Sequence, residues 1–240
     1  MISRAIDARV LRSLLRGLPR RGSHAERLQA FYGPQAEHYD NFRERLLQGR
    51  RGLIALMAPP DGASIVELGG GTGRNLGYFG DRLARMGRVE IVDLCPALLE
   101  QARRRTTALA NVRVVEADAT TYRPAAPVDC VYFSYALTMM PDWQAAIDNA
   151  VAMLRPGGML GVVDFYVAAA RPRPGEAVHG AFTRYFWPRW FAHDGVRLTP
   201  AHLARLRSQL PDHECRECMA PVPYLPGARV PYYIFVGRRP

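Results

Sequence analysis

The chain has 240 residues, of which 48% are hydrophobic and 22% are charged. That length suits one well-cored α/β domain and is short for two, and no apolar run approaches the roughly eighteen residues that a membrane span requires. The formal net charge of +10 comes entirely from arginine, since the sequence contains no lysine, and it permits nucleic acid, anionic lipid or an acidic substrate as partner. Four unevenly spaced cysteines, with no signal-peptide pattern before them, argue against a secreted disulfide framework and indicate a cytoplasmic protein.

Residues 1–22 are predicted to form a basic amphipathic helix that stops at Pro19 and Gly22. Apolar side chains recur on one helical face of this segment, and six arginines against the single acid Asp7 fill the remainder. Such a helix either lies on a membrane surface or packs on the rest of the fold, and the sequence leaves both interpretations open.

Residues 23–62 are predicted to be helical in two pieces, with a break near Gly33-Pro34 and a second helix from Gln35 to Met57. This segment holds a polar and aromatic cluster made of Tyr32, Tyr39-Asp40 and Arg43. The cluster either covers a ligand as a lid or packs its aromatic rings against the sheet.

Residues 64–75, with the sequence SIVELGGGTGRN, join a strand-like run to a helix-forming segment through four glycines in five positions. Such a passage brings bare backbone amides and a helix N-terminus close to a nucleotide-like ligand. The spacing differs from the dinucleotide fingerprint, and the Lys-Ser/Thr pair of a phosphate-binding loop is absent. A second strand-like run ends at Asp93, whose carboxylate suits the two hydroxyls of a ribose.

Strand-like and helix-like segments alternate through the rest of the core. Strands are predicted at 63–68, 88–93, 112–116, 128–134 and 159–165, and helices at 73–85, 96–109 and 142–154. Alternation of this kind predicts a parallel sheet with helices on both faces and a ligand crevice beyond the carboxyl ends of the strands. Pro156-Gly157-Gly158 is expected to form the turn into the fifth strand.

The C-terminal part begins with residues 167–198, an irregular segment rich in arginine, proline and aromatic residues that is expected to cap a substrate. A helix from Thr199 to Leu210 and two closing strands at 214–220 and 230–237 follow. The two strands are predicted to form an antiparallel hairpin at the edge of the sheet.

The glycine loop, Asp93 and Asp118 together resemble the class I S-adenosylmethionine-dependent methyltransferases. The resemblance implies a seven-stranded, mostly parallel Rossmann-like sheet in one domain over residues 23–240, with S-adenosylmethionine as cofactor. In that superfamily the glycine loop supports the methionine half of the cofactor, the acid after the second strand binds the ribose, and an acid after the third strand meets the adenine. The implied cofactor-binding residues are Tyr39, Arg43, Glu67, Gly69, Gly71, Gly73, Asp93, Leu94, Asp118, Ala119 and Ser134.

Methyl transfer is an in-line displacement that depends on positioning donor and acceptor, so we expect no metal site. Tyr135, just past the fourth strand, is expected to face the reacting methyl group, although packing in the core is an alternative. Asp164 either meets the substrate or caps the loop that follows the fifth strand, and His179 is a further catalytic candidate in the cap segment. Residues 134–143 lack the motifs of nucleobase methyltransferases, which disfavours nucleic acid as substrate.

Cys215 and Cys218, with His213 before them, have a spacing that invites a zinc or redox interpretation. A zinc site needs four ligands, and the chain offers no second cysteine pair. We therefore expect these thiols to be inert.

Beyond the superfamily core, several stretches resemble the bacterial betaine-lipid N-methyltransferases, which convert diacylglyceryl-homoserine to diacylglyceryl-trimethylhomoserine. The matching stretches are residues 24–27, 31–43, 69–75, 133–143, 186–191, 194–196, 223–226 and 230–237. The resemblance implies a lipid substrate at the inner membrane surface, a peripheral location there, and a separate aminocarboxypropyl transferase that supplies the substrate. Arg184 and Arg189 are candidates for binding the homoserine carboxylate, and Tyr32, Tyr135 and Trp187 for facing the methylated cation. Another lipid, a quinone or a small molecule remains an alternative acceptor, and a non-catalytic cofactor-binding or scaffold protein is a third interpretation.

Overall fold

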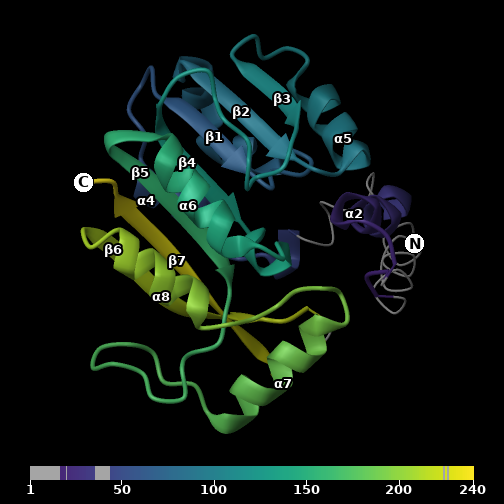
Figure 1. Cartoon of the computed structure of the whole chain (residues 1–240), viewed down its shortest axis with the longest axis vertical. Coiled ribbons are helices and arrows are strands. Elements are labelled where there is room, and N and C mark those ends of the chain that lie inside the picture. Colours follow the sequence, from purple (N-terminus) through teal and green to yellow (C-terminus); the bar gives the residue numbers. More distant parts are fainter. Residues whose placement is uncertain (1–16, 20, 36–43, 224, 226) are drawn as a thin grey trace.

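The computed structural model describes residues 17–19, 21–35, 44–223, 225 and 227–240. Its centre is a seven-stranded sheet with the strand order β3-β2-β1-β4-β5-β7-β6 (Figure 1). The strands are β1 Ser64–Leu68, β2 Arg88–Asp93, β3 Val112–Glu116, β4 Val128–Ser134, β5 Leu154–Phe165, β6 His213–Pro221 and β7 Arg229–Arg238. The first five are parallel, while β7 pairs antiparallel with both β5 and β6. The predicted sheet, with its antiparallel edge hairpin, is confirmed.

Strand β1 lies at the point where the chain direction across the sheet reverses, between β2 and β4. Its last residue, Leu68, pairs with Val92 on one side and with Phe133 on the other. The carboxyl ends of these three strands therefore meet at one edge of the sheet. In open α/β sheets, ligands bind at such a switch point.

Alternating side chains of the sheet build two cores. Val66, Leu68 and Phe133 face one side with Ile147 of α6 and Leu206 of α8, whereas the neighbouring sheet positions face the opposite side. The opposite core joins Ile65, Val89 and Tyr132 to Leu53 of α4, Leu76 of η2 and Leu99 of α5. The period of two along each strand thus places helices on both faces, as the alternation of segments predicts.

The helices that the structure describes are α2 His24–Tyr32, η1 Gly33–Gln35, α4 Arg50–Met57, η2 Arg74–Arg85, α5 Pro96–Thr106, η3 Leu137–Met139, α6 Trp143–Met153, α7 Ala181–Ala192 and α8 Ala201–Gln209. Helix α2 begins with a capping box, in which Ser23 Oγ accepts from the Glu26 amide and Glu26 Oε2 accepts from the Ser23 amide. Its Phe31 and Tyr32 pack against Cys95 and Leu98, next to the carboxyl end of β2.

Three predicted segments differ from the structure. The predicted helix from Gln35 to Met57 is wrong as one element, because α4 begins only after Gly49, whose φ of +81° is left-handed and breaks any helix before it. The predicted 73–85 helix is a 3₁₀ element with a kink at Gly80, where φ is +56°. Residues 155–158 do not lead into β5 through a simple turn. They are looped out within it, because Val128 pairs with Leu154 but Cys130 pairs with Met159.

The predicted irregular segment at 167–198 contains the twelve-residue helix α7, despite Pro188 in its interior. Trp187 and Phe191 are buried on the inner face of α7 in a cluster with Phe165 and Val230. Burial of these large rings outweighs the helix-breaking tendency of the proline. The predicted helix 1–22 and the 36–43 part of the predicted lid lie outside the described residues, apart from Gly17–Pro19, Arg21 and Gly22.

Candidate cofactor and acceptor site

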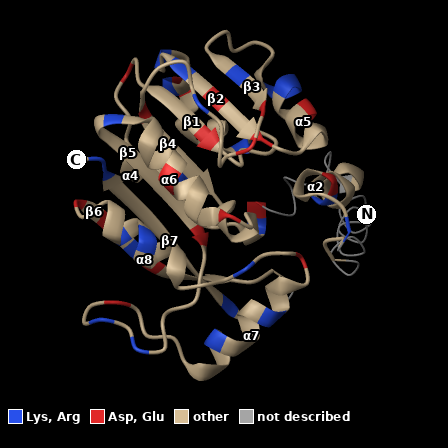
Figure 2. Cartoon of the chain, in the orientation of Figure 1, with Lys and Arg blue, Asp and Glu red and all other residues tan. Residues whose placement is uncertain are grey.

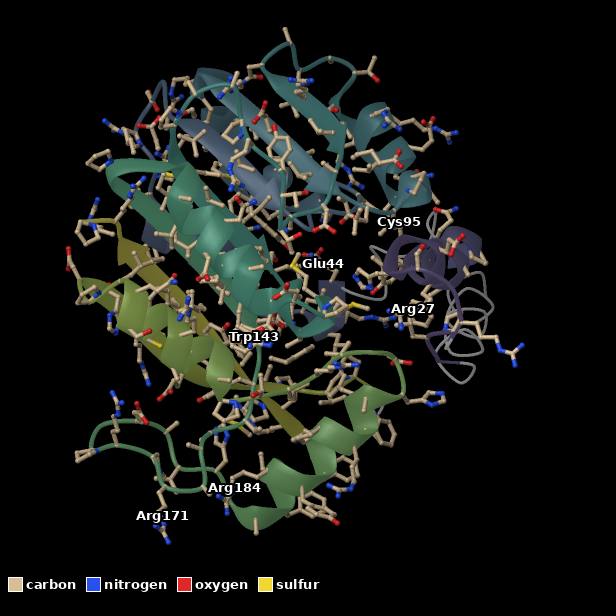
Figure 3. All side chains as sticks on the ribbon, in the orientation of Figure 1. Arg27, Glu44, Cys95, Trp143, Arg171 and Arg184 are labelled. Carbon is tan, nitrogen blue, oxygen red and sulfur yellow. The ribbon has the colours of Figure 1, made fainter. Side chains whose placement is uncertain are left out.

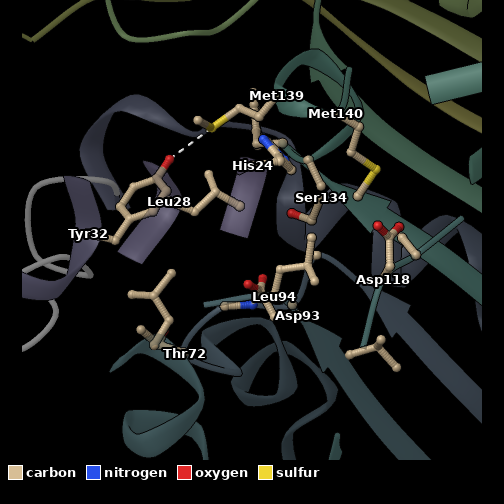
Figure 4. Close-up of a pocket in the computed structure, with 18 of the residues that line it drawn as sticks. His24, Leu28, Tyr32, Thr72, Asp93, Leu94, Asp118, Ser134, Met139 and Met140 are labelled. Atoms are coloured by element: carbon tan, nitrogen blue, oxygen red, sulfur yellow. Dashed lines mark hydrogen bonds between the residues drawn. The ribbon is translucent and has the colours of Figure 1, made fainter. Parts of the chain in front are cut away.

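An open cavity of about 1210 Å³ lies at the carboxyl ends of β1, β2 and β4 (Figure 4). Residues of α2, the glycine loop, the β2–α5 and β3–β4 loops and the segment after β4 form its walls. The lining includes eight residues that the sequence predicts for the site: Gly69, Gly71, Asp93, Leu94, Asp118, Ala119, Ser134 and Tyr135. The tertiary structure therefore gathers most of the predicted site around one space.

The glycine loop is held in place by the neighbouring strand, because the amides of Gly69 and Gly70 both donate to the carbonyl of Val92, at 2.8 and 3.1 Å. Gly69, Gly71 and Gly73 all have positive φ, which strongly favours glycine. A Cβ on Gly69 would lie 2.5 Å from Ala136 Cβ, and one on Gly73 would lie 2.8 Å from Ile91 Cδ1. A Cβ on Gly71 would contact only Leu98 Cδ1, at 3.6 Å, so at this position the loop borders the cavity.

Gly73 does not line the cavity and has a packing role in this structure, and its contact with the cofactor stays a prediction. Its position is too crowded for a side chain because Ile91 and Ala102 pack against it. Gly73 also caps the start of η2 with a φ of +67°.

Asp93 ends β2 and faces the cavity with both carboxylate oxygens anchored. Oδ2 accepts from the Gly71 amide and Oδ1 from the Cys95 amide, each at 2.9 Å. Burial raises the pKa of Asp93, and the two amides partly offset that shift. Each oxygen has a further lone pair, so this carboxylate fits the adjacent hydroxyls of a ribose.

Asp118 and Ser134 provide polar groups on two other walls of the cavity. Asp118 Oδ1 accepts from the amide and hydroxyl of Thr120, at 2.8 and 2.7 Å, which fixes the carboxylate and leaves Oδ2 without a bond to Thr120. Ser134 Oγ is buried and has no hydrogen-bond partner within the described part of the chain. A buried hydroxyl of this kind is costly unless a ligand or water pairs with it. Both groups therefore fit a polar ligand such as S-adenosylmethionine.

Glu67 lies beneath the glycine loop and does not line the cavity. Its carboxylate accepts from Asn75 Nδ2 at 2.6 Å and from Tyr132 Oη at 2.8 Å. Burial raises the pKa of Glu67 to about 7. Glu67 fixes the first turn of η2 through Asn75, and its part in binding the cofactor stays a prediction.

Of the three predicted catalytic residues, only Tyr135 lines the cavity. Tyr135 has a φ of +55°, a strained value for a residue with a side chain, and its hydroxyl donates to the Gln48 carbonyl at 2.6 Å. Burial raises the pKa of Tyr135 well above its ordinary value. The hydroxyl is thus protonated at neutral pH and fixes the ring against the cavity wall.

Asp164 is fully buried behind the cavity wall and does not line it. Its carboxylate accepts from the amide of Thr138 at 3.1 Å, the hydroxyl of Thr138 at 2.8 Å and the amide of Phe165 at 2.8 Å. Burial raises the pKa of Asp164 to about 7. Of the two predicted alternatives, the geometry favours the structural one, because Asp164 ties the start of η3 to β5.

His179 is not brought to the cavity either. Its Nδ1 accepts from the Ala168 amide at 2.9 Å, and its ring packs edge-on against Tyr166. The arginines predicted for the acceptor carboxylate also lie elsewhere: neither Arg184 nor Arg189 lines the cavity, and Arg189 stacks over the ring of Tyr185 at 3.3 Å. Tyr39 and Arg43 lie outside the described residues.

Arg50 is a cavity residue that the sequence analysis missed. Only 7% of its side chain is exposed, and it is held by the Leu47 carbonyl at 3.0 Å and by Glu44 Oε2 at 2.9 Å. Glu44 also accepts from Arg74 at 3.2 Å and from the hydroxyl of Tyr78 at 2.5 Å. A buried, orientated guanidinium in a cavity wall fits a carboxylate. No spacing motif marks Arg50, because only the fold brings α4 next to the glycine loop.

His24 and Tyr32 of α2 also line the cavity, and the sequence analysis did not single out His24. Burial and the neighbouring Arg27 lower the pKa of His24, so its imidazole is neutral at pH 7. The hydroxyl of Tyr32 contacts Met139 Sδ at 2.8 Å, which connects α2 to the segment after β4 (Figure 4). Helix α2 thus closes one side of the cavity.

The described residues contain no group of three or more His, Cys, Asp or Glu side chains placed to hold a metal ion. Cys215 and Cys218 lie on β6, and their thiols are free. Burial raises the pKa of Cys215 to about 11, which keeps that thiol protonated.

The core of the chain is similar to known methyltransferases. Residues 65–158 match the family model described as a methyltransferase domain. Trans-aconitate 2-methyltransferase of Azoarcus sp. (strain BH72) is 31% identical over 126 residues, which are 52% of this chain and 48% of that protein. The ubiquinone/menaquinone biosynthesis C-methyltransferase UbiE of Enterobacter sp. (strain 638) is 27% identical over 165 residues, 66% of this chain and 64% of that protein.

Among solved structures, the N-methyltransferase NodS from Bradyrhizobium japonicum WM9 in complex with S-adenosyl-l-homocysteine has the same fold. The TM-score is 0.62 at 20% sequence identity, with 90% of this chain and 96% of that chain covered. Residues 65–158 are therefore similar to a methyltransferase domain, and the chain has the fold of this methyltransferase structure. The chain spans about half the length of the trans-aconitate methyltransferase that it matches.

Proposed function

We propose that the protein transfers methyl groups from S-adenosylmethionine to an acceptor that binds in the same cavity. The observation that carries this proposal is one open cavity whose lining joins the glycine loop and Asp93 to a wall formed by Tyr32 and Tyr135. Both sets of residues line one continuous open cavity, so a cofactor against the glycine loop and an acceptor against the two rings can lie next to each other. Asp93 would hold the ribose, Asp118 the adenine, and Gly69 and Gly71 the methionine half.

When bound, S-adenosylmethionine supplies a methyl group by in-line displacement: the acceptor nitrogen gains the methyl and loses a proton, and S-adenosylhomocysteine is left. The residues of the chain hold and orient the reactants. Tyr135 is fixed by its bond to the Gln48 carbonyl and Tyr32 by Met139, so two aromatic rings keep their positions in the wall. Because the Tyr135 hydroxyl stays protonated, it does not serve as the base, and the acceptor amine must lose its proton to another group or to water.

The acceptor that we propose is diacylglyceryl-homoserine, converted by three successive methylations to diacylglyceryl-trimethylhomoserine. Support comes from the matching stretches of sequence, which lie largely outside the glycine loop. Arg50 supplies a cation for the homoserine carboxylate, replacing Arg184 and Arg189 in that role. The rings of Tyr32 and Tyr135 are suited to the fixed positive charge of the product. A separate aminocarboxypropyl transferase would have to supply the substrate.

A smaller acidic acceptor or a quinone is the second candidate. The names of two curated relatives, a trans-aconitate methyltransferase and a quinone C-methyltransferase, favour it. Arg50 would bind the carboxylate of an acidic acceptor equally well. Product chemistry separates these reactions, because a carboxyl methyl ester is cleaved by mild base whereas N-methyl and C-methyl bonds are not.

The test is to incubate the purified full chain with S-adenosylmethionine and, separately, diacylglyceryl-homoserine in mixed micelles, trans-aconitate and a demethylated quinone. Formation of S-adenosylhomocysteine gives the rate, and mass spectrometry with base treatment gives the product. We expect mono-, di- and trimethylated lipid to appear in sequence. Base-labile product from trans-aconitate alone, or transfer to the quinone alone, would replace the lipid assignment. The absence of S-adenosylhomocysteine binding would overturn the methyltransferase proposal itself.

A further inference from the structure

Helix α7 carries a row of aromatic side chains on its outer face. Phe182, Phe186 and Trp190 follow one another at intervals of four residues, with ring centroids 5.0 and 5.6 Å apart. Phe182 is 73% exposed and Trp190 is 50% exposed, and Tyr185 beside them is 64% exposed. We call Phe182, Tyr185, Phe186 and Trp190 the aromatic ladder.

The aromatic ladder is not needed to attach α7 to the fold. Trp187 and Phe191 on the inner face do this, since they are 2% and 5% exposed and Phe191 stacks on Phe165 with centroids 4.9 Å apart. Phe165 in turn packs against Tyr135 at 4.6 Å, and Tyr135 lines the cavity. Helix α7 thus holds its exposed rings on a rigid support that shares a wall with the cavity.

Four neighbouring aromatic side chains, three of them largely exposed, form an apolar patch of a kind that marks an interaction site in soluble proteins. Phe182, Tyr185 and Trp190 are three of the five large hydrophobic side chains that are exposed among the described residues. A fourth, Val178, is 80% exposed and lies four residues before Phe182, ahead of the start of α7. The exposed apolar residues of the described chain are therefore concentrated at this end of the molecule.

The charged side chains of α7 itself are all positive. Helix α7 contains two arginines and no acidic residue (Figure 2). Arg189 stacks over the ring of Tyr185 at 3.3 Å, which keeps a guanidinium at the same level as the exposed rings. Figure 3 shows Arg184 of α7 and Arg171 of the preceding loop at the same lower end of the molecule. Arginine, tryptophan and tyrosine side chains each have an apolar part and a polar or charged end. They are therefore suited to the headgroup region of an anionic bilayer, which lies between water and the acyl chains.

We propose that the aromatic ladder of α7 docks on the surface of an anionic lipid bilayer. The phenylalanine and tryptophan rings enter the boundary between headgroups and acyl chains, and the arginines pair with lipid phosphates. In this orientation the shared wall of Phe165 and Tyr135 connects the bilayer surface to the cavity. None of the helices in the described part of the chain has the length and apolar character needed to cross a bilayer, so the contact is at the surface. This inference deepens the proposed function, on which it rests for the identity of the lipid acceptor.

The test compares the full chain with a Phe182→Ala/Tyr185→Ala/Trp190→Ala variant in sedimentation with large vesicles. One set of vesicles is phosphatidylcholine and the other is phosphatidylcholine mixed with phosphatidylglycerol. We expect the full chain to bind the mixed vesicles better and the triple variant to bind them at least about tenfold more weakly. Met219→Ala removes an exposed apolar side chain on β6, 37% exposed, and should bind as the unmodified chain does.

Brominated lipids test the orientation directly. The chain has three tryptophans, of which Trp187 is 2% exposed and Trp190 is 50% exposed. Brominated acyl chains should quench the fluorescence of the full chain, and Trp190→Phe should remove most of that quenching while binding persists. Trp143→Phe is the matched control and should leave the quenching in place. Equal vesicle binding by the triple variant, or quenching unchanged in Trp190→Phe, would overturn the docking surface.

Two further measurements separate this inference from its alternatives. Sedimentation velocity without lipid shows whether the ladder joins two copies instead: a dimer that the triple variant loses would also overturn the membrane assignment. Titration with S-adenosylhomocysteine should give the same affinity for the triple variant and the full chain. Vesicle binding with no activity on any lipid would leave the docking surface standing and refute the lipid acceptor. Normal cofactor binding without vesicle binding would refute the docking surface and leave the methyltransferase proposal standing.

Discussion

Substitution by alanine should mainly lower cofactor affinity at Gly71 and mainly lower stability at Gly69, although both residues have positive φ and both line the cavity. Replacing Gly71 by alanine places the new Cβ in the cavity beside Leu98 Cδ1, at an ordinary distance of 3.6 Å. The folded state then bears only the left-handed strain, about 1 kcal/mol. Replacing Gly69 by alanine adds a contact of 2.5 Å with Ala136 Cβ. Such overpacking costs a further 1–3 kcal/mol or so, and the total is about 3 kcal/mol.

Gly62→Ala is the matched control for strain alone, because Gly62 has a φ of +82° and nothing lies within 4 Å of its Cβ position. Urea unfolding should show Gly71→Ala close to Gly62→Ala, and Gly69→Ala about 2 kcal/mol less stable than either. In isothermal titration, the affinity for S-adenosylhomocysteine should fall more in Gly71→Ala than in Gly69→Ala. Gly71→Ala should weaken binding by about tenfold or more, which is about 1.4 kcal/mol, and Gly71→Val should weaken it further. Unchanged affinity in both Gly71 variants would refute the placement of the cofactor against this loop.

Three further predictions test the neighbouring parts of the site. Asp93→Ala should reduce S-adenosylhomocysteine affinity by about a hundredfold in the same titration, because two charge-assisted hydrogen bonds to the ribose are lost, whereas Asp93→Asn should lose less. Glu67 has its pKa raised by burial from 4.5 to about 7, so the folded state binds the proton more tightly than the unfolded state. Its contribution to the free energy of unfolding is therefore complete below pH 4.5 and is lost as the pH rises to about 7, by up to about 3 kcal/mol. Urea titrations between pH 4.5 and 8 should show this decline, and Glu67→Gln should reduce its slope; an equal slope in both proteins would mean that Glu67 is ionised throughout. Deleting residues 1–22 should weaken binding to anionic vesicles, most strongly at low salt, without changing S-adenosylhomocysteine affinity, and full vesicle binding by the truncated chain would assign that segment to packing.

The sequence by itself determined the fold class and predicted most of the residues that the fold gathers around one cavity. The signals for β1, β2 and β4 are local: each is a short apolar run that ends at a glycine, an acid or a serine, and parallel strands bring such ends to one edge. For that reason the sequence alone predicts one ligand site for a set of residues that all line the cavity: Gly69, Gly71, Asp93, Asp118 and Ser134. The alternation of apolar side chains along a strand and the position of a glycine in a tight turn depend on residues that are neighbours along the chain. The sequence shows such neighbours directly.

Only the tertiary structure decided which side chains reach the cavity from distant elements. Arg50 lines the cavity because α4 packs beside the glycine loop. Asp164 instead accepts a hydrogen bond from Thr138, and His179 accepts one from the Ala168 amide. Helix α7 forms across a proline because Trp187 and Phe191 find partners from β5 and β7. These outcomes depend on contacts between residues far apart in the chain, and the energy of such contacts exceeds the local preferences that a sequence displays.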